Sequence, residues 1–373
     1  MADKKIKVLF VVQDLEIGGA EQLKFTIEKY IDKEKYETIY CCIKRMGAIG
    51  QEIKKRGGNV IVLNAVDNFY NIVATLRLYN LVKKIQPHII HSMLFNANFH
   101  ARIVGIMLKK PVIIEEHGLY IWKKWYHILI DKILAKSTKK VIAVSDSVKK
   151  FIINQEQLDS DKVIVLYDCV DPNFVKSKTK RGEERKKLSI ADDVFLIGTV
   201  GNLREEKGHR ILFHALKQVL SKYKNLQLFI VGDGPLYKYL LEQTKRLGIE
   251  KSVVFLKKKS NIAGFLRALD LFVLPSTSEG LGIALIEAIA AQLPCIASNV
   301  GGIKEIAEGV EDVTLVKPNN PMDLSNAIMS AIEKNKSLMR DHDFAEGMTI
   351  KDIFTPKTYL SHLEQIYKEA IKV

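Results

Sequence analysis

Short apolar runs alternate with amphipathic stretches along almost the whole chain of 373 residues. In the first half the runs include IKVLFVV (6–12), ETIYCCI (37–43) and HIIHSM (88–93), and each is typical of a buried strand. Between the strands lie stretches with apolar residues at helical spacing, such as AEQLKFTIEKYI (20–31). Strands that alternate with helices predict a parallel, doubly wound α/β sheet covered by helices on both faces.

A charged segment, VKSKTKRGEERKKLS (175–189), interrupts this alternation, which resumes at VFLIGTVG (194–201). The segment has no strand signal and is typical of an exposed connection between domains. We therefore expect two Rossmann-like domains, over residues 1–178 and 190–354, facing a cleft. Ligands of such sheets bind beyond the carboxyl ends of the strands. A final amphipathic helix is expected over residues 355–373.

Composition and charge limit the class of protein. The net charge of +14 favours an anionic partner, whether nucleic acid, an anionic membrane or a phosphorylated ligand, with lysine-rich solubility as the alternative. The first residues do not form a signal peptide, and no run approaches the ~20 apolar residues of a membrane helix. The four cysteines show no CxxC pair or metal pattern, which favours a reducing, cytoplasmic compartment.

The stretch STSEGLGIALIEAIAAQ (276–292) places Glu279 and Glu287 on either side of a glycine-rich turn. An apolar run before the turn and a helical pattern after it predict a strand, a loop and a helix, with Ser276 or Ser278 as the helix cap. Free amides at a helix start suit a phosphate. Glu287 lies between apolar neighbours, where an unpaired carboxylate is costly. A ligand, a salt bridge to a lysine and a simple capped helix are the alternatives.

This stretch resembles the E-x7-E element of the family-four retaining glycosyltransferases, which have the GT-B fold. Other segments resemble further signatures of that family in the same order: GGAE (18–21), EEHG (115–118), AVSDSVKKF (143–151), GNLREEKGHR (201–210), VGDGP (231–235) and SNVGGIKEI (298–306). Any one of them alone is a weak signal, and GGAE or GDG alone would be an ordinary turn, but together they cover nearly the whole chain. The resemblance implies a GT-B protein whose C-terminal helix returns to the N-terminal domain.

The resemblance implies an enzyme, a retaining hexosyltransferase. It would move a hexose-type sugar from a nucleoside-diphosphate sugar to an acceptor hydroxyl of a lipid-linked or cell-surface polysaccharide precursor. The donor, with a UDP-sugar favoured, would bind mainly to the C-terminal domain and the acceptor to the N-terminal one. Neither a metal nor another cofactor is implied. The alternative is another GT-B enzyme, such as a nucleotide-sugar epimerase or a glycosyl phosphorylase.

Carried over residue by residue, the resemblance implies three catalytic side chains, His117, Glu279 and Lys207. Glu287 would bind the donor ribose, and Lys207 would neutralise the diphosphate leaving group. The other donor-binding residues implied are Gly18, Gly19, Asn202, Arg204, Gly232, Gly280, Leu281, Gly282 and Ile283. The family usually has arginine at the position of Asn202, so Arg204 is the alternative cation. A satisfied structural histidine is the alternative for His117.

Segment 118–140, GLYIWKKWYHILIDKILAKSTKK, holds both tryptophans of the chain and six lysines, Lys123 and Lys124 among them. Aromatic residues mixed with lysines suit the surface of an anionic bilayer, and a core helix with a solvated lysine face is the alternative. We expect a cytoplasmic protein with peripheral contact at the inner face of the cell membrane.

Two other classes of function find less support. A nicotinamide-dependent oxidoreductase would carry G-x-G-x-x-G, but DLEIGGAEQL and VGDGPLYKYL both lack the third glycine. A nucleic-acid-binding protein would explain the positive charge, but the sequence shows no zinc pattern, no RNP-like strand and no recognition helix. The DSD motif (159–161) is interpreted as a turn rather than a metal site.

Overall fold

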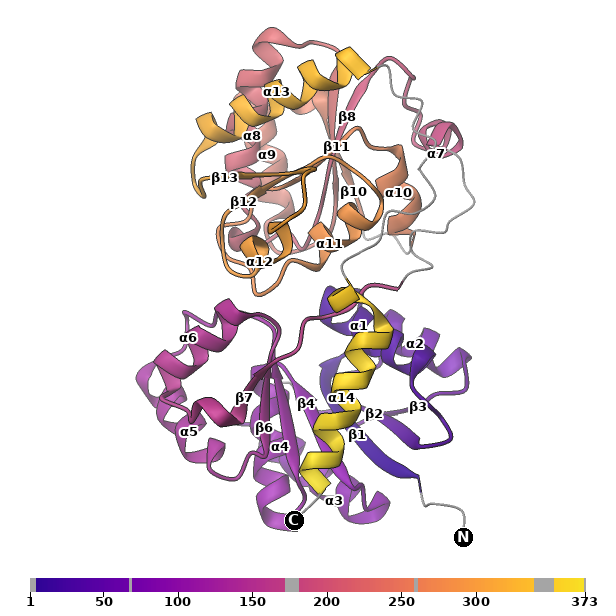
Figure 1. Cartoon of the computed structure of the whole chain (residues 1–373), viewed down its shortest axis with the longest axis vertical. Helices are drawn as coiled ribbons and strands as arrows, with labels where there is room; N and C mark the ends of the chain where they lie inside the picture. Colours follow the sequence, from indigo (N-terminus) through magenta and orange to yellow (C-terminus); the bar gives the residue numbers. More distant parts are fainter. Residues whose placement is uncertain (1–4, 67–68, 172–180, 258–260, 339–351, 372–373) are drawn as a thin grey trace. The chain divides into compact units, whose positions relative to one another are not determined.

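The structure, a computed structural model, describes residues 5–66, 69–171, 181–257, 261–338 and 352–371. The chain forms two compact units. Unit 1 comprises Met1–Cys169 and Ile353–Val373, and unit 2 comprises Val170–Asp352. Each unit contains one parallel sheet with helices on both sides (Figure 1).

The strands of unit 1 are β1 (Ile6–Asp14), β2 (Tyr36–Arg45), β3 (Asn59–Val62), β4 (Ile89–Met93), β5 (Val112–Glu116), β6 (Lys140–Ala143) and β7 (Val163–Val165). Its helices are α1 (Gly19–Tyr30), α2 (Gly47–Lys55), α3 (Ile72–Ile85), α4 (Phe95–Leu108), α5 (Trp125–Ala135), α6 (Asp146–Glu156), the 3-10 turns η1 (Ser160–Lys162) and η5 (Asp352–Phe354), and α14 (Pro356–Ile371). All strand pairs are parallel, in the order β3-β2-β1-β4-β5-β6-β7.

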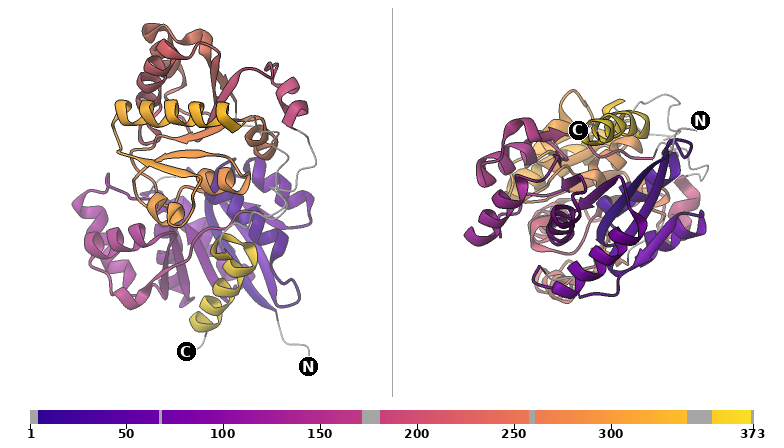
Figure 2. Two further views of the ribbon diagram at one scale, coloured as in Figure 1. Left: turned by 45° about the horizontal axis from the view of Figure 1, so that its top comes forward. Right: turned by 90° about the horizontal axis from the view of Figure 1, so that it is seen from below.

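The helix α14 belongs to unit 1, although all of unit 2 separates it from β7 in the sequence. Its buried residues recur at helical spacing, and Tyr359, Leu363 and Tyr367 join the core formed by Phe10 and Tyr40 of the sheet. In Figure 2 this yellow helix lies against the indigo and purple elements of unit 1. A segment from the end of the chain therefore completes the first core.

The strands of unit 2 are β8 (Phe195–Val200), β9 (Leu226–Val231), β10 (Val253–Leu256), β11 (Leu271–Leu274), β12 (Cys295–Ser298) and β13 (Val313–Val316). Its helices are α7 (Arg181–Lys187), α8 (His209–Lys222), α9 (Tyr237–Leu247), α10 (Ile262–Ala268), α11 (Ile283–Ala290), α12 (Ile303–Ala307) and α13 (Pro321–Leu338), with the 3-10 turns η3 (Glu205–Lys207) and η4 (Glu250–Ser252). The parallel order is β10-β9-β8-β11-β12-β13.

Both sheets have the strand order of a Rossmann fold, so the prediction of two doubly wound α/β domains is confirmed. The central strands are buried over most of their length, as continuous apolar runs require. The four cysteines are buried and unpaired with one another. None of the described helices is long and apolar enough to cross a bilayer.

One sequence prediction was wrong in part. Residues 172–180 lie outside the described residues, but 181–187 of the expected connection form helix α7. Arg185 is fully buried, its guanidinium lies 3.2 Å from the Asp270 carboxylate, and it also donates to the Val194 carbonyl at 2.6 Å. Because its ionic partner Asp270 lies 85 positions away, the charged composition of the segment did not indicate this anchored helix.

Candidate active site

The sheet of unit 2 reverses its strand order between β8 and β11. The chain continues from β8 to β9 and β10 on one side, and from β11 to β12 and β13 on the other. The loops after β8 and β11 therefore diverge over the carboxyl edge of the sheet, where ligands of such sheets bind. The first loop ends in η3 with Lys207, and the second contains Glu279. The topology thus brings two of the predicted catalytic residues together.

Lys207 and Glu279 form an ion pair in which Nζ lies 2.7 Å from Oε1. The Ser276 hydroxyl donates to the same carboxylate oxygen, also at 2.7 Å. The Glu279 side chain is 9% exposed and that of Lys207 is 24% exposed, so the lysine is within reach of an incoming ligand. A backbone hydrogen bond of 2.8 Å from Thr277 to Glu206 joins the two loops. The pair offers a fixed cation to an anion and a carboxylate to sugar hydroxyls.

Glycines let the loops at this edge approach one another closely. Gly208 has a φ of +65°, and an added Cβ would lie 1.9 Å from the Pro275 carbonyl oxygen. Gly301 has a φ of +50°, and its Cβ would lie 1.7 Å from the Glu279 carbonyl oxygen. A Cβ on the predicted donor residue Gly232 would likewise lie 1.9 Å from a carbonyl oxygen of the loop after β8. Of these three, Gly208 and Gly301 approach the loop that contains Glu279, so they are needed for the packing that places it.

The helix α11 begins at Ile283, and its N-cap is Gly282 with a φ of +103°. The prediction that Ser276 or Ser278 caps this helix is wrong, since no side chain of the described residues does so and Ser276 donates to Glu279 instead. The turn and the first helical position contain the predicted donor residues Gly280, Leu281, Gly282 and Ile283. The first amides of a helix lack partners within the helix, so this turn suits an anion.

Glu287 lies on α11 among apolar side chains and is only partly exposed. Across the parts of the chain that the structure describes, no side chain forms a hydrogen bond or an ion pair with its carboxylate. Burial without a compensating partner raises its pKa to about 8. The alternative of a salt bridge to a lysine is therefore not found among the described residues.

The remaining predicted donor residues of this loop are Asn202 and Arg204. Both precede η3, and Arg204 is exposed. Arg204 lines a hollow of about 270 Å³ together with His209 and Arg210. Neither Lys207 nor Glu279 lines that hollow.

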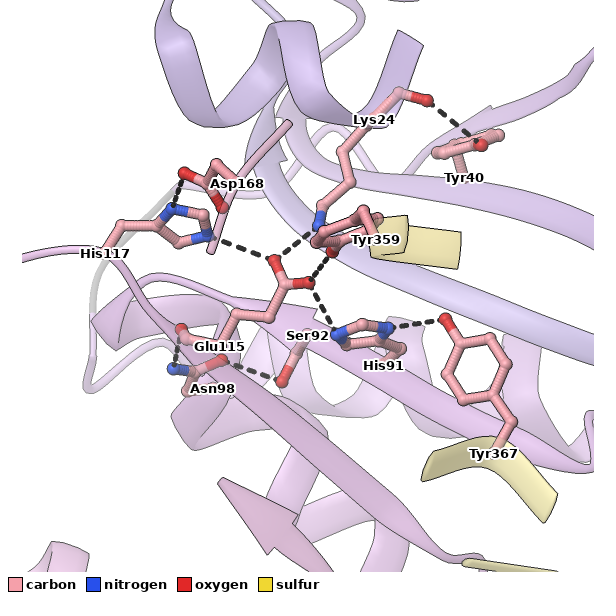
Figure 3. A network of polar contacts seen from close by, with 10 residues as sticks. All are labelled: Lys24, Tyr40, His91, Ser92, Asn98, Glu115, His117, Asp168, Tyr359 and Tyr367. Atoms are coloured by element: carbon pink, nitrogen blue, oxygen red, sulfur yellow. Dashed lines mark hydrogen bonds and ion pairs between the residues drawn. The ribbon is translucent and has the colours of Figure 1, made fainter. Parts of the chain in front are cut away.

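In unit 1 a buried carboxylate connects the predicted histidine to several elements (Figure 3). Glu115, near the end of β5, accepts hydrogen bonds on Oε2 from Lys24 Nζ of α1 and, at 3.0 Å, from His117 Nε2. Its Oε1 accepts from the Tyr359 hydroxyl of α14 at 3.0 Å. On its other side, the Nδ1 of His117 lies 3.4 Å from the Asp168 carboxylate. The predicted histidine is thus held between two carboxylates.

His91 extends this network towards α14. Its Nδ1 lies 2.7 Å from the Tyr367 hydroxyl, and its Nε2 lies 3.0 Å from Glu115 Oε1 without the geometry of a hydrogen bond. Burial lowers the pKa of His91 more than Glu115 raises it. We therefore treat His91 as neutral near pH 7, so that the charges facing one another are those of Lys24 and His117 against Glu115 and Asp168.

The surroundings fix the charge of Glu115 and His117. Burial alone would raise the pKa of Glu115, but Lys24 and the cationic His117 hold it well below its usual range. Burial alone would lower the pKa of His117, but Asp168 and Glu115 outweigh it and raise this pKa to about 10. His117 is therefore a cation near neutral pH with both ring nitrogens facing carboxylates. To bind a sugar hydroxyl through nitrogen it would have to release one of them.

The predicted glycine loop lies where α1 begins, with Gly18 as the N-cap and Gly19 as the first helical residue. Gly18 has a φ of −166°, an extended conformation that any residue adopts. The atoms nearest to an added Cβ all belong to the Glu21 side chain, which can move. The fold itself therefore does not require glycine at position 18. Both glycines belong to unit 1, as does His117.

Comparison with known proteins identifies the family. The sequence model of Glycosyltransferase Family 4 matches residues 17–174, and that of Glycosyl transferases group 1 matches residues 180–346. The chain belongs to the family-four glycosyltransferases. The predictions of the family and of an enzyme are therefore confirmed.

Curated relatives of this glycosyltransferase match most of its length. An Escherichia coli protein named UDP-Gal:alpha-D-GlcNAc-diphosphoundecaprenol alpha-1,3-galactosyltransferase is 26% identical over 347 residues, 87% of each chain. The Staphylococcus aureus capsular polysaccharide biosynthesis glycosyltransferase CapM is 26% identical over 327 residues, 82% of each chain.

A solved structure supports the GT-B fold of the glycosyltransferase. Anabaena HepE, crystallised with UDP and glucose, aligns with a TM-score of 0.84 at 23% identity, over 97% of this chain and 99% of that one. At this level of identity the similarity shows the fold alone.

Sequence reasoning missed several polar residues around His117 in the glycosyltransferase. Glu115 and Glu116 end the buried strand β5, and Lys24 lies on the buried side of α1. Charged side chains within buried elements need partners, so the pair EE after VII was an available signal. Tyr359 gave none, because its partner Glu115 lies 244 positions away.

A third correction concerns Lys123, which was counted with the lysines of a membrane surface. In the glycosyltransferase its side chain is only 1% exposed, and its Nζ lies 2.7 Å from Asp131 Oδ2. The other oxygen of Asp131 pairs with the buried Arg102. Lys123 is therefore a core residue.

Among the described residues no group of three or more His, Cys, Asp or Glu side chains could hold a metal ion.

Proposed function

We propose that the enzyme transfers a hexose-type sugar, with retention of anomeric configuration, from a nucleoside-diphosphate sugar to an acceptor hydroxyl. A UDP-sugar is the favoured donor. Unit 2 would bind the donor and unit 1 the acceptor. The observation that most supports this proposal is the Lys207–Glu279 ion pair beside the turn that opens α11.

The chemistry of glycosyl transfer makes use of such a pair. When the glycosyl–diphosphate bond breaks, negative charge grows on the β-phosphate and positive charge on the anomeric carbon. Lys207 and the first amides of α11 would stabilise the phosphate charge more in the transition state than in the ground state. Glu279, released from Lys207 by the incoming phosphate, would accept hydrogen bonds from the transferred sugar.

Glu287 is assigned to the donor ribose. A carboxylate accepts hydrogen bonds from two vicinal hydroxyls without leaving a donor unpaired. Those bonds would supply the partners that Glu287 lacks among the described residues and would return its pKa towards the usual range. Binding of the nucleotide would thus compensate an energetic cost built into the ligand-free protein.

The acceptor is inferred from the relatives. One is named for transfer to a sugar on diphosphoundecaprenol, and another for capsular polysaccharide biosynthesis. We propose an acceptor of the same class for this enzyme, a lipid-linked or cell-surface polysaccharide precursor. The proposal implies a peripheral enzyme that works at the inner face of the cell membrane, and it gives the cationic His117 a place on the acceptor side.

The test is acceptor-dependent release of nucleoside diphosphate. Purified enzyme is incubated with UDP-, GDP- and ADP-sugars, with and without a detergent-solubilised polyprenyl-diphosphate sugar. We expect release with one nucleotide class only when the acceptor is present, and NMR of the product should show that an α-donor gives an α-glycoside. Isomerised donor without acceptor, or a requirement for inorganic phosphate, would instead identify an epimerase or a phosphorylase.

A variant tests the role of Lys207. Lys207→Met should lower kcat by about a hundredfold to a thousandfold, because a group that stabilises transition-state charge is lost. The control is Lys217→Met, at an exposed position of α8, which should leave kcat unchanged. Equal kcat values for both variants would show that Lys207 takes no part in catalysis.

A further inference from the structure

The outer side of α5 and the loop before it expose large apolar side chains. Five of them are between 49% and 77% exposed: Ile121, Trp122, Trp125, Leu129 and Ile133. On α5, Trp125, Leu129 and Ile133 recur every four residues and so form one stripe along the helix. A second group, from the start of α3 and the residues before it, is between 50% and 73% exposed: Tyr70, Ile72, Val73 and Leu76.

A cluster of aromatic rings joins the two groups into one surface. The ring of Phe69 lies 5.3 Å from that of Phe95 and 5.5 Å from that of His127. Trp122 contacts the same two rings, at 5.1 Å from Phe95 and 5.7 Å from His127. Residues about fifty positions apart in the sequence therefore pack against the same two rings. We name the nine exposed side chains above the apolar face of unit 1.

The charges beside the apolar face are positive. Segment 118–140 has four exposed lysines, Lys124, Lys132, Lys136 and Lys139. Its single acidic residue, Asp131, is buried between Arg102 and Lys123 and does not reach the surface. An apolar stripe edged by lysines, without an exposed carboxylate from this segment, complements a surface of acyl chains and anionic headgroups.

The apolar face begins at the edge of the sheet where the candidate acceptor site lies. The loop before α3 follows β3, and the loop before α5 follows β5, so both start at the carboxyl ends of parallel strands. His117 is the first residue after β5 and leads directly into Ile121 and Trp122. A bilayer on this face would therefore lie beside the loop that carries the network around Glu115.

We propose that the apolar face of unit 1 docks on an anionic phospholipid bilayer, with Ile121 and Trp125 entering the interface and the exposed lysines binding the headgroups. A second copy of the chain suits the face less well, because a two-fold interface would set lysines against lysines. The identification of the surface stands on its own geometry. Its purpose, the delivery of a lipid-linked acceptor, rests on the proposed function.

The experiment is sedimentation of the purified full chain with vesicles of phosphatidylcholine, with or without phosphatidylglycerol. We expect binding to the anionic vesicles that weakens as salt is added, and much weaker binding to phosphatidylcholine alone. Ile121→Ser with Trp125→Ser should lower the partition coefficient by about tenfold or more. Lys132→Glu with Lys136→Glu should lower it to a similar degree on anionic vesicles only.

Matched controls come from unit 2. Met322 and Tyr237 are exposed by 57% and 41%, so Met322→Ser with Tyr237→Ser removes two exposed large apolar side chains of unit 2. Lys217→Glu changes the charge of another exposed lysine. Both controls should bind vesicles like the wild type.

Several results would overturn the proposal. They are absence of vesicle binding, equal binding by the apolar-face variants and the controls, or a dimer in solution that Trp125→Ser dissociates. The donor site is checked separately by the nucleotide dependence of thermal unfolding. Failure of that response with intact vesicle binding would refute the proposed function and leave the docking surface standing.

Discussion

The carboxyl group of Glu287 has no hydrogen-bond or ion-pair partner among the described residues. Its pKa of about 8 lies above the usual value of 4.5. The folded state therefore keeps a proton that the unfolded chain releases above pH 4.5. This group favours folding fully below pH 4.5, and the contribution is lost as the pH rises through about 8. The ligand-free enzyme should thus be less stable at alkaline pH than its other contacts would allow.

The variant Glu287→Gln should unfold at a higher temperature than the wild type at pH 8 and at nearly the same temperature at pH 4.5. Because the side chain retains some contact with water, we expect a gain of about 2 kcal/mol rather than the full value of the shift. The measurement is thermal unfolding without nucleotide at both pH values. Glu242→Gln, at an exposed position of α9, is the control. A pH-independent effect of Glu287→Gln would mean that this carboxyl group is not perturbed.

His117 should remain protonated through the physiological range, because it lies between Glu115 and Asp168 and its pKa is about 10. NMR of the labelled imidazole, with Asp168→Asn as the comparison, measures this directly. We expect no titration between pH 6 and 8 in the wild type and a lower midpoint in Asp168→Asn. A wild-type midpoint of about 6.5, the usual value for histidine, would contradict the network.

At the scale of the element, α14 closes the polar network as well as the apolar core of unit 1. Its hydroxyls reach Glu115 and His91 from one side of the helix. Tyr359→Phe should lower the free energy of unfolding by about 1–3 kcal/mol, because a buried carboxylate loses a hydrogen-bond donor. Denaturant unfolding followed by circular dichroism measures it.

The matched control is Tyr36→Phe. The Tyr36 hydroxyl is buried without a hydrogen-bond partner in the described structure, and its ring contacts that of Tyr367 on α14. Removing that hydroxyl should cost little. If both variants lost the same free energy of unfolding, the hydrogen bond from Tyr359 to Glu115 would add no stability of its own.

The elements differ in how well the sequence predicts them. The continuous apolar runs predicted the central strands, because a strand buried on both faces can hold few polar residues. The start of α11 was predicted, but its cap was not, because Gly282 with a left-handed backbone occupies the N-cap position where a serine was expected. Helix α7 was missed because Asp270, the partner of its Arg185, lies 85 positions away.

The candidate site divides in the same way. Family motifs predicted Lys207 and Glu279, and the structure places them in contact although 72 positions separate them. The motif that contains His117 was predicted, but the side chains that contact His117 were not. Glu115 needs Lys24, 91 positions away, and Tyr359, so its environment exists only after the sheet and α14 have assembled. Local patterns indicate which residues are unusual, and the topology decides which of them meet.

At the scale of the whole molecule, two cores allow two unfolding transitions. Both tryptophans, Trp122 and Trp125, lie in unit 1, so tryptophan fluorescence follows that unit alone. Calorimetry follows both units. We expect UDP at ~100 times its dissociation constant to stabilise the transition without a fluorescence change, that of unit 2, by about 2.7 kcal/mol. GDP, ADP and NAD serve as comparisons.

Glu287→Gln should abolish the response to UDP while leaving the fluorescence-detected transition in place. A shift of that transition alone would place the nucleotide in unit 1 and contradict the assignment of the donor residues. A shift with NAD but with no nucleoside diphosphate would reopen the oxidoreductase alternative.

The membership of α14 in unit 1 also has a consequence for biosynthesis. The ribosome makes the segment of unit 1 that ends at Cys169, then all of unit 2, and only then the helix that supplies Tyr359 and Tyr367. Unit 2 is contiguous in the chain, so it can fold as soon as it emerges. Until α14 follows, the nascent first sheet exposes apolar surface beside Phe10 and Tyr40 and leaves Glu115 short of a donor. The unit made first is therefore the unit finished last, and chaperones would meet it during that interval.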